Sequence, residues 1–270
     1  MTDKYCVIGN PIAHSKSPQI HAAYAAATGQ DISYERCLAP LDGFEATVRR
    51  LVQEGYRGAN VTVPFKLEAF RLATRLEARA RAAGAVNTLV FTPEGEVVGD
   101  NTDGAGLVAD IVRNAGVPLQ GKRVLMLGAG GAARGAMLPL LLEGPRELVI
   151  ANRTLATAEA LARDFPEYAG RIAVRGFAQV EGAFDVVVNA TSASLAADLP
   201  PVPASVFCQE TLALDMMYGN KPTVYMAFAA SHGARVRDGL GMLVEQAAEA
   251  FALWRGVRPG TADVLKSMRQ

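Results

Sequence analysis

Lys66 is the residue of this chain best suited to exchange a proton with a bound ligand. It follows Pro64, whose fixed φ and missing N–H suit the first position of a helix. In the first turn of that helix the positive end of the dipole disfavours an ammonium ion, whereas a nearby carboxylate would stabilise the charge and orient the amine. Taken alone, Lys66 also fits an exposed helix lysine, and Asp103 a helix N-cap.

Two other arrangements that handle the proton of an alcohol are disfavoured by residue spacing. His14, His21 and His232 form no H-x-x-x-H and have no cysteine cluster near them, which argues against a zinc alcohol dehydrogenase. Tyr218 and Lys221 are three positions apart rather than four, so they break the Y-x-x-x-K pattern of short-chain dehydrogenases. We therefore expect no metal in the site and keep Lys66 as the candidate.

A glycine-rich turn in mid-chain is the second feature that indicates a functional site. Gly128, Gly130 and Ala133 satisfy the dinucleotide pattern G-x-G-x-x-[G/A] between an apolar run at 124–127 and a helical stretch beginning near Arg134. The first glycine allows the tight turn and the second lets a pyrophosphate approach the backbone. The spacing alone is weak evidence, because glycine turns after strands are frequent.

The end of the next expected strand points to the kind of dinucleotide. An NAD site places an acidic residue there on the ribose 2′-hydroxyl, but this chain has Asn152-Arg153-Thr154. The amide and hydroxyl can hydrogen-bond a 2′-phosphate, and Arg153 offers it a charged fork and can stack on adenine. The pattern favours NADP over NAD, although Thr157 stands where a further basic residue would have strengthened the preference.

Composition limits the class of protein and its partners. The chain has 270 residues, half of them hydrophobic, which is enough for two domains with separate cores. Its 27 basic and 27 acidic residues balance, so nothing marks a nucleic-acid or membrane-surface binder and we expect a small-molecule partner. Three widely spaced cysteines and the lack of an evident signal peptide or long apolar stretch fit a soluble cytoplasmic protein.

Apolar runs and helical patterns alternate through most of the chain, as in α/β proteins with largely parallel sheets. In the first half we expect strands at 5–8, 33–37, 58–63, 88–91 and 97–98 and helices at 18–28 and 41–54. A further helix should begin at Pro64, and it and a companion helix should run to about Ala83. A helix from Thr102 or Asp103 to Gly116 should bridge to a doubly wound unit with strands at 123–127, 148–151, 172–174, 185–189 and 212–215 and helices at 155–164 and 222–231. The last helices, at 240–255 and 261–268, add no strand and should pack on the first domain.

Ordered motifs over nearly the whole chain resemble the shikimate dehydrogenase family. They are Ser15-Lys16-Ser17-Pro18, Asn60-Val61-Thr62-Val63-Pro64-Phe65-Lys66, Gly84-Ala85-Val86-Asn87-Thr88, Gly99-Asp100-Asn101-Thr102-Asp103-Gly104, the glycine turn, Asn152-Arg153-Thr154, Asn189-Ala190-Thr191-Ser192 and the run from Asp238 to Gln246. The resemblance implies a substrate-binding catalytic domain at 1–102 completed by 238–270, a Rossmann-like NADP domain at 103–237, and an active site between them.

The same resemblance implies reversible reduction of 3-dehydroshikimate to shikimate by NADPH, in the route to aromatic amino acids. Lys66 and Asp103 would be the catalytic pair, Lys66 exchanging the proton at the C3 oxygen and Asp103 orienting the amine. Substrate contacts would come from Ser15, Ser17, Asn60, Thr62, Asn87, Tyr218 and Gln246. Cofactor contacts would come from Gly128, Ala129, Gly130, Gly131, Ala132, Asn152, Arg153, Thr154, Thr191, Ser192, Met216 and Gly239.

Five of the substrate-binding candidates also have a structural explanation. Ser15 and Ser17 suit a turn or cap before Pro18, and the asparagines and Gln246 suit strand ends and a helix surface. One departure from the family pattern is visible, because the glycine usual two residues after Ser192 is replaced by Ser194. A side chain there would stiffen or reshape the loop on the nicotinamide side.

Three alternatives remain open from the sequence. A quinate or dual quinate/shikimate dehydrogenase, perhaps with NAD, would share the fold and the lysine–aspartate pair. A non-catalytic NADP-binding regulator would need neither Lys66 nor Asp103, so their presence argues against it. Either a monomer or a homodimer is compatible with the chain.

Overall fold

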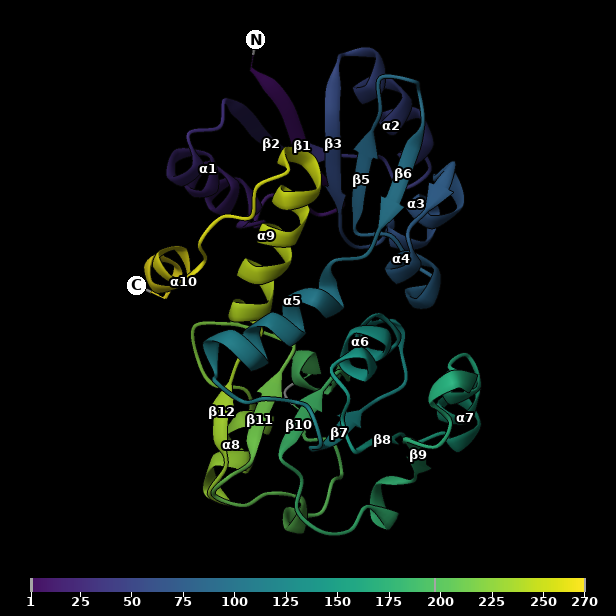
Figure 1. Cartoon of the computed structure of the whole chain (residues 1–270), viewed down its shortest axis with the longest axis vertical. Coiled ribbons are helices and arrows are strands. Elements are labelled where there is room, and N and C mark those ends of the chain that lie inside the picture. Colours follow the sequence, from purple (N-terminus) through teal and green to yellow (C-terminus); the bar gives the residue numbers. More distant parts are fainter. Residues whose placement is uncertain (1, 197, 270) are drawn as a thin grey trace. The chain divides into compact units, whose positions relative to one another are not determined.

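The computed structural model describes residues 2–196 and 198–269. The chain folds into two compact units (Figure 1). The first unit consists of residues 1–106 and 243–270, and the second of residues 107–242. The division falls within helix α5 (Asp103–Ala109), near the position where the sequence predicts a bridging helix.

The first unit contains a mixed six-stranded sheet in the order β2-β1-β3-β5-β6-β4. Its strands are β1 (Asp3–Gly9), β2 (Ile32–Leu38), β3 (Tyr56–Val61), β4 (Arg75–Leu76), β5 (Thr88–Phe91) and β6 (Val97–Asp100). β1 pairs in parallel with β2 and β3, whereas β5 is antiparallel to both β3 and β6. The expected hairpin of β5 and β6 is therefore present, and it places β3 and β6 in the same direction.

Two hydrophobic clusters stabilise this unit. In one, Phe44, Val48 and Leu51 of α2 (Phe44–Gln53) pack with apolar residues of the sheet. In the other, Ile20 and Tyr24 of α1 (Ser17–Thr28) pack with residues of α9 (Leu240–Arg255) and α10 (Ala262–Met268). The Tyr24 hydroxyl also donates to the carbonyl of Val244, 2.8 Å away. This packing confirms that the C-terminal helices return to the first unit.

The second unit is a fully parallel sheet in the order β9-β8-β7-β10-β11-β12. Its strands are β7 (Arg123–Leu127), β8 (Glu147–Ala151), β9 (Ile172–Arg175), β10 (Val186–Asn189), β11 (Leu212–Asp215) and β12 (Arg235–Arg237), and its main helices are α6 (Gly131–Leu142), α7 (Leu155–Arg163) and α8 (Val224–Ser231). In chain order this is the 3-2-1-4-5-6 arrangement of dinucleotide-binding sheets. The doubly wound prediction is confirmed, and ligands of such sheets bind at the carboxyl ends of the strands.

Two short strands, β4 and β12, were not predicted. In β12, Val236 is the only apolar residue and the flanking arginines fit an edge strand that pairs with β11 alone. In β4, two residues between helices pair in parallel with β6. Both strands form through pairing with a distant neighbour, so too few apolar residues mark them locally.

Pro64 does not occupy the first helical position. The Phe65 N–H donates to the Thr62 carbonyl across a turn, 3.0 Å away, and α3 (Lys66–Leu72) begins only at Lys66. Phe65 is fully buried and stacks on Phe44, with ring centroids 5.0 Å apart. Packing of this ring holds the turn, and Lys66 still lies in the first turn of its helix.

The helix expected to continue to Gly116 also changes character. Its second part, Asp110–Asn114, is a π-helix rather than an α-helix. The buried Asp110 carboxylate accepts hydrogen bonds from Asn114 and from the guanidinium of Arg237. Within the described ranges, 2–196 and 198–269, no helix is both long and apolar enough to cross a membrane.

Candidate active site and cofactor pocket

Lys66 and Asp103 meet at one edge of the first sheet. Because β3 and β6 run in the same direction, their carboxyl ends lie at the same edge, and each is followed closely by a helix. Lys66 is the first residue of α3 and Asp103 the first of α5. Lys66 Nζ donates to Asp103 Oδ2 at 2.5 Å, and the side chains are 32% and 18% exposed. The pair is therefore fixed in geometry yet still accessible to a ligand.

Asn87 joins this pair to the C-terminal helix α9. It precedes β5, whose amino end lies at the same edge because the strand is antiparallel. Asn87 Nδ2 donates to Asp103 Oδ1 at 2.9 Å and to Gln246 Oε1 at 3.1 Å, while its Oδ1 accepts from the Thr102 N–H at 2.9 Å. Both carboxylate oxygens of Asp103 are therefore held, one by the amine and one by the amide.

Asn60 continues this hydrogen-bonded cluster along the sheet edge. Its Nδ2 donates to Thr88 Oγ1 at 3.1 Å and to the Asn87 carbonyl at 3.3 Å. Its Oδ1 accepts from the hydroxyl of Tyr34 at 2.7 Å. Burial raises the pKa of the Tyr34 phenol well above its usual range, and a hydrogen bond with Ser17 opposes that shift. Tyr34 thus connects Asn60 with the start of α1.

The serine pair lies at the start of α1, and Thr62 lies just after β3, in the same unit. Ser15 Oγ donates to Ser17 Oγ at 3.2 Å, and Arg36 holds the loop by donating twice to the Ser15 carbonyl at 2.6 and 3.1 Å. Thr62 follows β3, and its methyl group lies 2.5 Å from the point where a Cβ on Gly9 would be. The close approach requires glycine at position 9 and keeps Thr62 packed against β1.

His21 supports Tyr34 from the interior and was not predicted to have a role. Its ring is fully buried and stacks on Tyr34 with centroids 4.2 Å apart and planes at 9°, and Trp254 packs nearby. Neither ring nitrogen has a hydrogen-bond partner within the described part of the chain. Burial lowers the pKa of His21 to about 3. A lone histidine in a helix gives no sequence signal for such an environment.

The neutral state of His21 makes stability depend on pH. The pKa is lower in the folded protein than in the unfolded chain, so the unfolded chain binds more protons as the pH falls from 7 to 4. We expect the wild type to lose about 3 kcal/mol of unfolding free energy over this range relative to His21→Phe, which cannot titrate. Urea unfolding of both proteins at each pH measures the difference. Parallel pH curves for the two proteins would contradict a buried neutral histidine.

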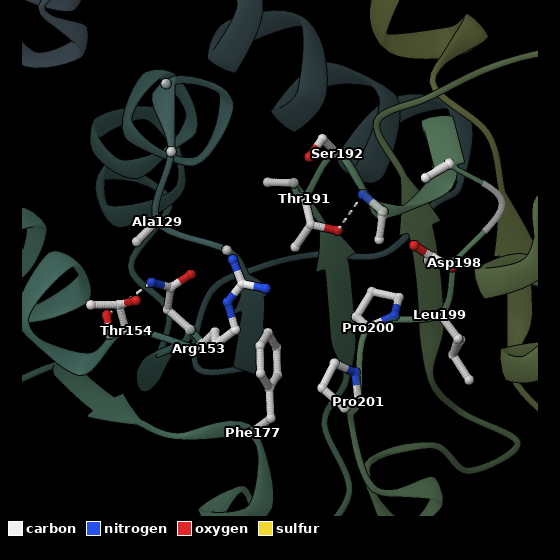
Figure 2. Close-up of a pocket in the computed structure, with 17 residues that line it drawn as sticks. Ala129, Arg153, Thr154, Phe177, Thr191, Ser192, Asp198, Leu199, Pro200 and Pro201 are labelled. Atoms are coloured by element: carbon white, nitrogen blue, oxygen red, sulfur yellow. Dashed lines mark hydrogen bonds between the residues drawn. The ribbon is translucent and has the colours of Figure 1, made fainter.

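The glycine turn of the second unit opens a pocket of about 760 Å³ at the carboxyl ends of its strands (Figure 2). Gly128 has a φ of 100°, a left-handed conformation that favours glycine. A Cβ on Gly128 would lie 3.1 Å from the methyl group of Thr191 and 3.3 Å from the Ala190 carbonyl oxygen. Helix α6 begins at Gly131, so the unpaired N–H groups of its first turn lie at this end of the helix. Such groups stabilise an anion.

Most of the predicted cofactor residues line this pocket. They are Gly128, Ala129, Gly130, Gly131, Asn152, Arg153, Thr154, Thr191 and Ser192. Arg153 and Thr154 are exposed, and Asn152 Nδ2 donates to the Thr154 carbonyl at 2.9 Å, which shapes the turn after β8. The pocket therefore brings together a helix N-terminus, for an anionic group, and an accessible arginine from the neighbouring strand.

Three predicted cofactor residues and one substrate residue of the second unit lie away from this lining. Ala132 is exposed on α6. Gly239 and Met216 contact each other instead, since a Cβ on Gly239 would lie 2.1 Å from the Met216 carbonyl oxygen. Tyr218 follows β11 and is 40% exposed.

Several residues that line the pocket were missed by sequence reasoning. Figure 2 shows Phe177 on the same side as Arg153, and Leu199, Pro200 and Pro201 on the other. Phe177 follows β9, so its position at the carboxyl end of a parallel strand was the signal available. The run 199–201 lies outside every expected strand and helix, and nothing in its local sequence shows which part of the fold it faces. Within the described residues, no group of three or more His, Cys, Asp or Glu could hold a metal ion.

Comparisons with known proteins agree along the whole chain. Residues 7–89 match a family model described as the shikimate dehydrogenase substrate binding domain, residues 110–197 match shikimate / quinate 5-dehydrogenase, and residues 239–269 match the shikimate 5'-dehydrogenase C-terminal domain. The NADP(+) shikimate dehydrogenase of Janthinobacterium sp. (strain Marseille) is 63% identical over 99% of this chain and 97% of that protein.

Solved structures show the same likeness. An Ael1 enzyme from Pseudomonas putida has a TM-score of 0.95 and 51% identity, covering 100% of this chain and 99% of that one. Shikimate 5-dehydrogenase from Thermus thermophilus, solved in complex with NADP(H) and shikimate, has a TM-score of 0.86 and 32% identity, and 99% of each chain is covered. With relatives this similar over their full length, the chain belongs to the shikimate dehydrogenase family.

Proposed function

We propose that the protein catalyses the reversible reduction of 3-dehydroshikimate to shikimate with NADPH. The curated relatives carry the name of this activity, with NADP(+) as cofactor. The observation that supports it most strongly in this chain is the Lys66–Asp103 pair, connected through Asn87 to Gln246. A protein that only bound NADP would not need a charged pair inside a cluster of directional polar groups.

Lys66 transfers the proton in this proposal. Reduction of the C3 carbonyl leaves negative charge on its oxygen, and the Lys66 ammonium donates the proton that converts it to a hydroxyl. In the reverse direction the amine accepts that proton. Asp103 holds Nζ through its 2.5 Å contact, so the amine does not have to be ordered during the reaction.

The polar residues around this pair bind the substrate. Asn60, Asn87 and Gln246 present amide groups at the same sheet edge, and amides both donate to and accept from ring hydroxyls. Ser15 and Ser17 offer two hydroxyls at the start of α1, and such donors suit the substrate carboxylate. We assign Thr62 and Tyr218 to the same substrate on the basis of the family motif. Directional contacts of this kind discriminate against analogues that lack a hydroxyl.

The second unit fits NADP. The glycine turn and the start of α6 would hold the pyrophosphate, and Gly128 approaches Thr191 so closely that any side chain there would disturb the turn. Asn152, Arg153 and Thr154 would hold the 2′-phosphate, with Arg153 free to stack on adenine. We keep Ala132, Met216 and Gly239 as cofactor contacts on the family motif alone. When bound, NADPH supplies the hydride for the C3 carbon.

A label-transfer experiment tests this reaction. NADPH with deuterium at both C4 positions of the nicotinamide is incubated with 3-dehydroshikimate and the purified protein, and the product is analysed by mass spectrometry. We expect shikimate one mass unit heavier than the unlabelled compound. Unlabelled shikimate, or no product, would overturn the proposed function.

Arg153 should determine the preference for NADP. A guanidinium fork on a phosphate is a charge-assisted interaction that contributes about 1.5–3 kcal/mol. We therefore expect Arg153→Ala to raise the KM for NADP at least about tenfold while the KM for NAD changes little. Initial rates with each cofactor at saturating shikimate measure the two constants.

Arg163→Ala is the matched control for this variant. Arg163 is an exposed arginine at the end of α7, in the same unit, and does not line the pocket. The Arg163→Ala variant loses the same charge but keeps the guanidinium of Arg153, so both KM values should stay near those of the wild type. Equal losses for NADP in the two variants would mean that net charge, not a contact with Arg153, sets the preference.

A further inference from the structure

We propose that Ser194 is a positioning residue that orders the cofactor loop through a directional chain of hydrogen bonds. This inference rests on the proposed function, because it concerns affinity for NADP. Ser194 Oγ donates to Asp215 Oδ2 at 2.6 Å and accepts from Asn189 Nδ2 at 3.1 Å. The hydroxyl thus connects the ends of two neighbouring strands, β10 and β11, with the loop between Thr191 and Ser194.

Asp215 anchors this chain of hydrogen bonds. It is fully buried at the end of β11, and its carboxylate also accepts from Thr223 Oγ1 at 2.6 Å and from the Met217 N–H at 3.0 Å. The carboxylate is a pure acceptor, so the single proton of Ser194 must point to it. Ser194 Oγ then has only lone pairs left for Asn189.

Ser194 and Thr191 together fix the orientation of the Asn189 amide. Because Nδ2 is the only end of the amide that can donate to Ser194, Oδ1 must face the other way. There it accepts from the Thr191 N–H at 3.1 Å and from Thr191 Oγ1 at 2.7 Å. Without the Ser194 hydroxyl, Nδ2 loses its acceptor, and only the hydrogen bonds from Thr191 still hold the amide in this orientation.

Thr191 transmits this order to the cofactor pocket. It lines the pocket with Ser192, and its methyl group is the nearest atom to the point where a Cβ on Gly128 would be, at 3.1 Å. Its hydroxyl also accepts from the Ala193 N–H at 3.3 Å, which closes the loop on itself. A shift of Thr191 would therefore alter the wall of the pocket next to the glycine turn.

A glycine at position 194 would offer no hydroxyl, so it would form neither the hydrogen bond to Asp215 nor the one from Asn189. The Ser194 hydroxyl therefore helps to order the loop before the cofactor arrives, and such pre-organisation improves affinity.

The test is direct NADP binding by calorimetry, without substrate, for the wild type, Ser194→Ala and Ser194→Gly. Loss of a partly buried hydrogen bond of ordinary strength predicts a Kd for NADP about three- to tenfold higher in both variants. The KM for shikimate should remain within about twofold of the wild type. The control Ser231→Ala removes an exposed hydroxyl that donates to the Phe228 carbonyl, and it should leave the Kd unchanged.

A double-mutant cycle with Thr191→Val separates the relay from general loosening of the unit. If Ser194 acts through Thr191, Ser194→Ala should raise the Kd by a clearly smaller factor in the Thr191→Val background than in the wild type. Equal factors in both backgrounds, or an unchanged Kd in both single Ser194 variants, would overturn this inference. A wild type that neither binds NADP nor turns over shikimate would instead mark failure of the proposed function.

Discussion

Lys66→Met is expected to lower kcat for shikimate oxidation by about a hundred- to ten-thousandfold while changing the KM for shikimate only modestly. Methionine keeps most of the volume of the side chain but has no proton to exchange, and general acid–base catalysis contributes about that factor. The loss should appear mainly in kcat because the proton moves only as the transition state forms. Steady-state rates at varied shikimate and saturating NADP separate the two constants.

Lys122→Met provides the matched control for this prediction. Lys122 forms an ion pair with Asp185 at 2.9 Å in the second unit, and it does not line the cofactor pocket. Breaking that pair removes the same charge and the same kind of contact, yet kcat should stay close to that of the wild type. A Lys66→Met protein that retains kcat within about threefold would contradict the role of Lys66.

Asp103→Asn is expected to lower kcat by about two to three orders of magnitude, the second large effect. Asparagine keeps the shape of the side chain and can still accept from Asn87. The substitution removes the negative charge that Lys66 Nζ contacts. If Asn87 keeps its acceptor, the new amide N–H group faces the Lys66 amine, and two hydrogen-bond donors then oppose each other. The amine then loses its fixed position, and effective positioning contributes strongly to rate. Binding of NADP in calorimetry should remain as in the wild type.

Asp185→Asn distinguishes loss of catalysis from loss of stability. Asp185 accepts from Lys122 and from the Arg123 N–H at 2.8 Å, so its replacement should reduce stability without affecting turnover. Asp103→Asn should show the reverse, with a large loss in kcat and a melting temperature close to that of the wild type. If its kcat falls only in proportion to the fraction of unfolded protein, Asp103 has no direct part in the reaction.

Local patterns predicted most of the fold. The strands with several consecutive apolar residues, such as β7 and β10, and the helices with apolar faces were found near their observed positions. The exceptions depend on distant contacts. β12 exists because β11 offers an unpaired edge, and the π-helix 110–114 surrounds a buried carboxylate that Arg237 neutralises. The local sequence of β12 does not show that β11 is its neighbour, and the local sequence of 110–114 does not show that Arg237 is the partner of the carboxylate.

The motifs indicated which residues gather at the sheet edge. The side chains that pack behind these residues could be identified only from the structure. Lys66, Asp103, Asn87 and Gln246 form one hydrogen-bonded cluster, as their joint presence in the family motifs suggested. Tyr34 lay outside every motif, although its hydroxyl fixes Asn60 and its ring packs on His21. Sequence spacing carries no information about a contact that crosses from one strand to another through the interior.

The most direct test of the central claim is a matrix of initial rates for shikimate and quinate, each with NADP and NAD. The arrangement of Lys66, Asp103 and the polar cluster in one unit and the Arg153 pocket in the other predicts the highest kcat/KM for shikimate with NADP. Faster turnover of quinate, or a preference for NAD, would contradict the proposed substrate or cofactor. No turnover in any combination would contradict catalysis itself.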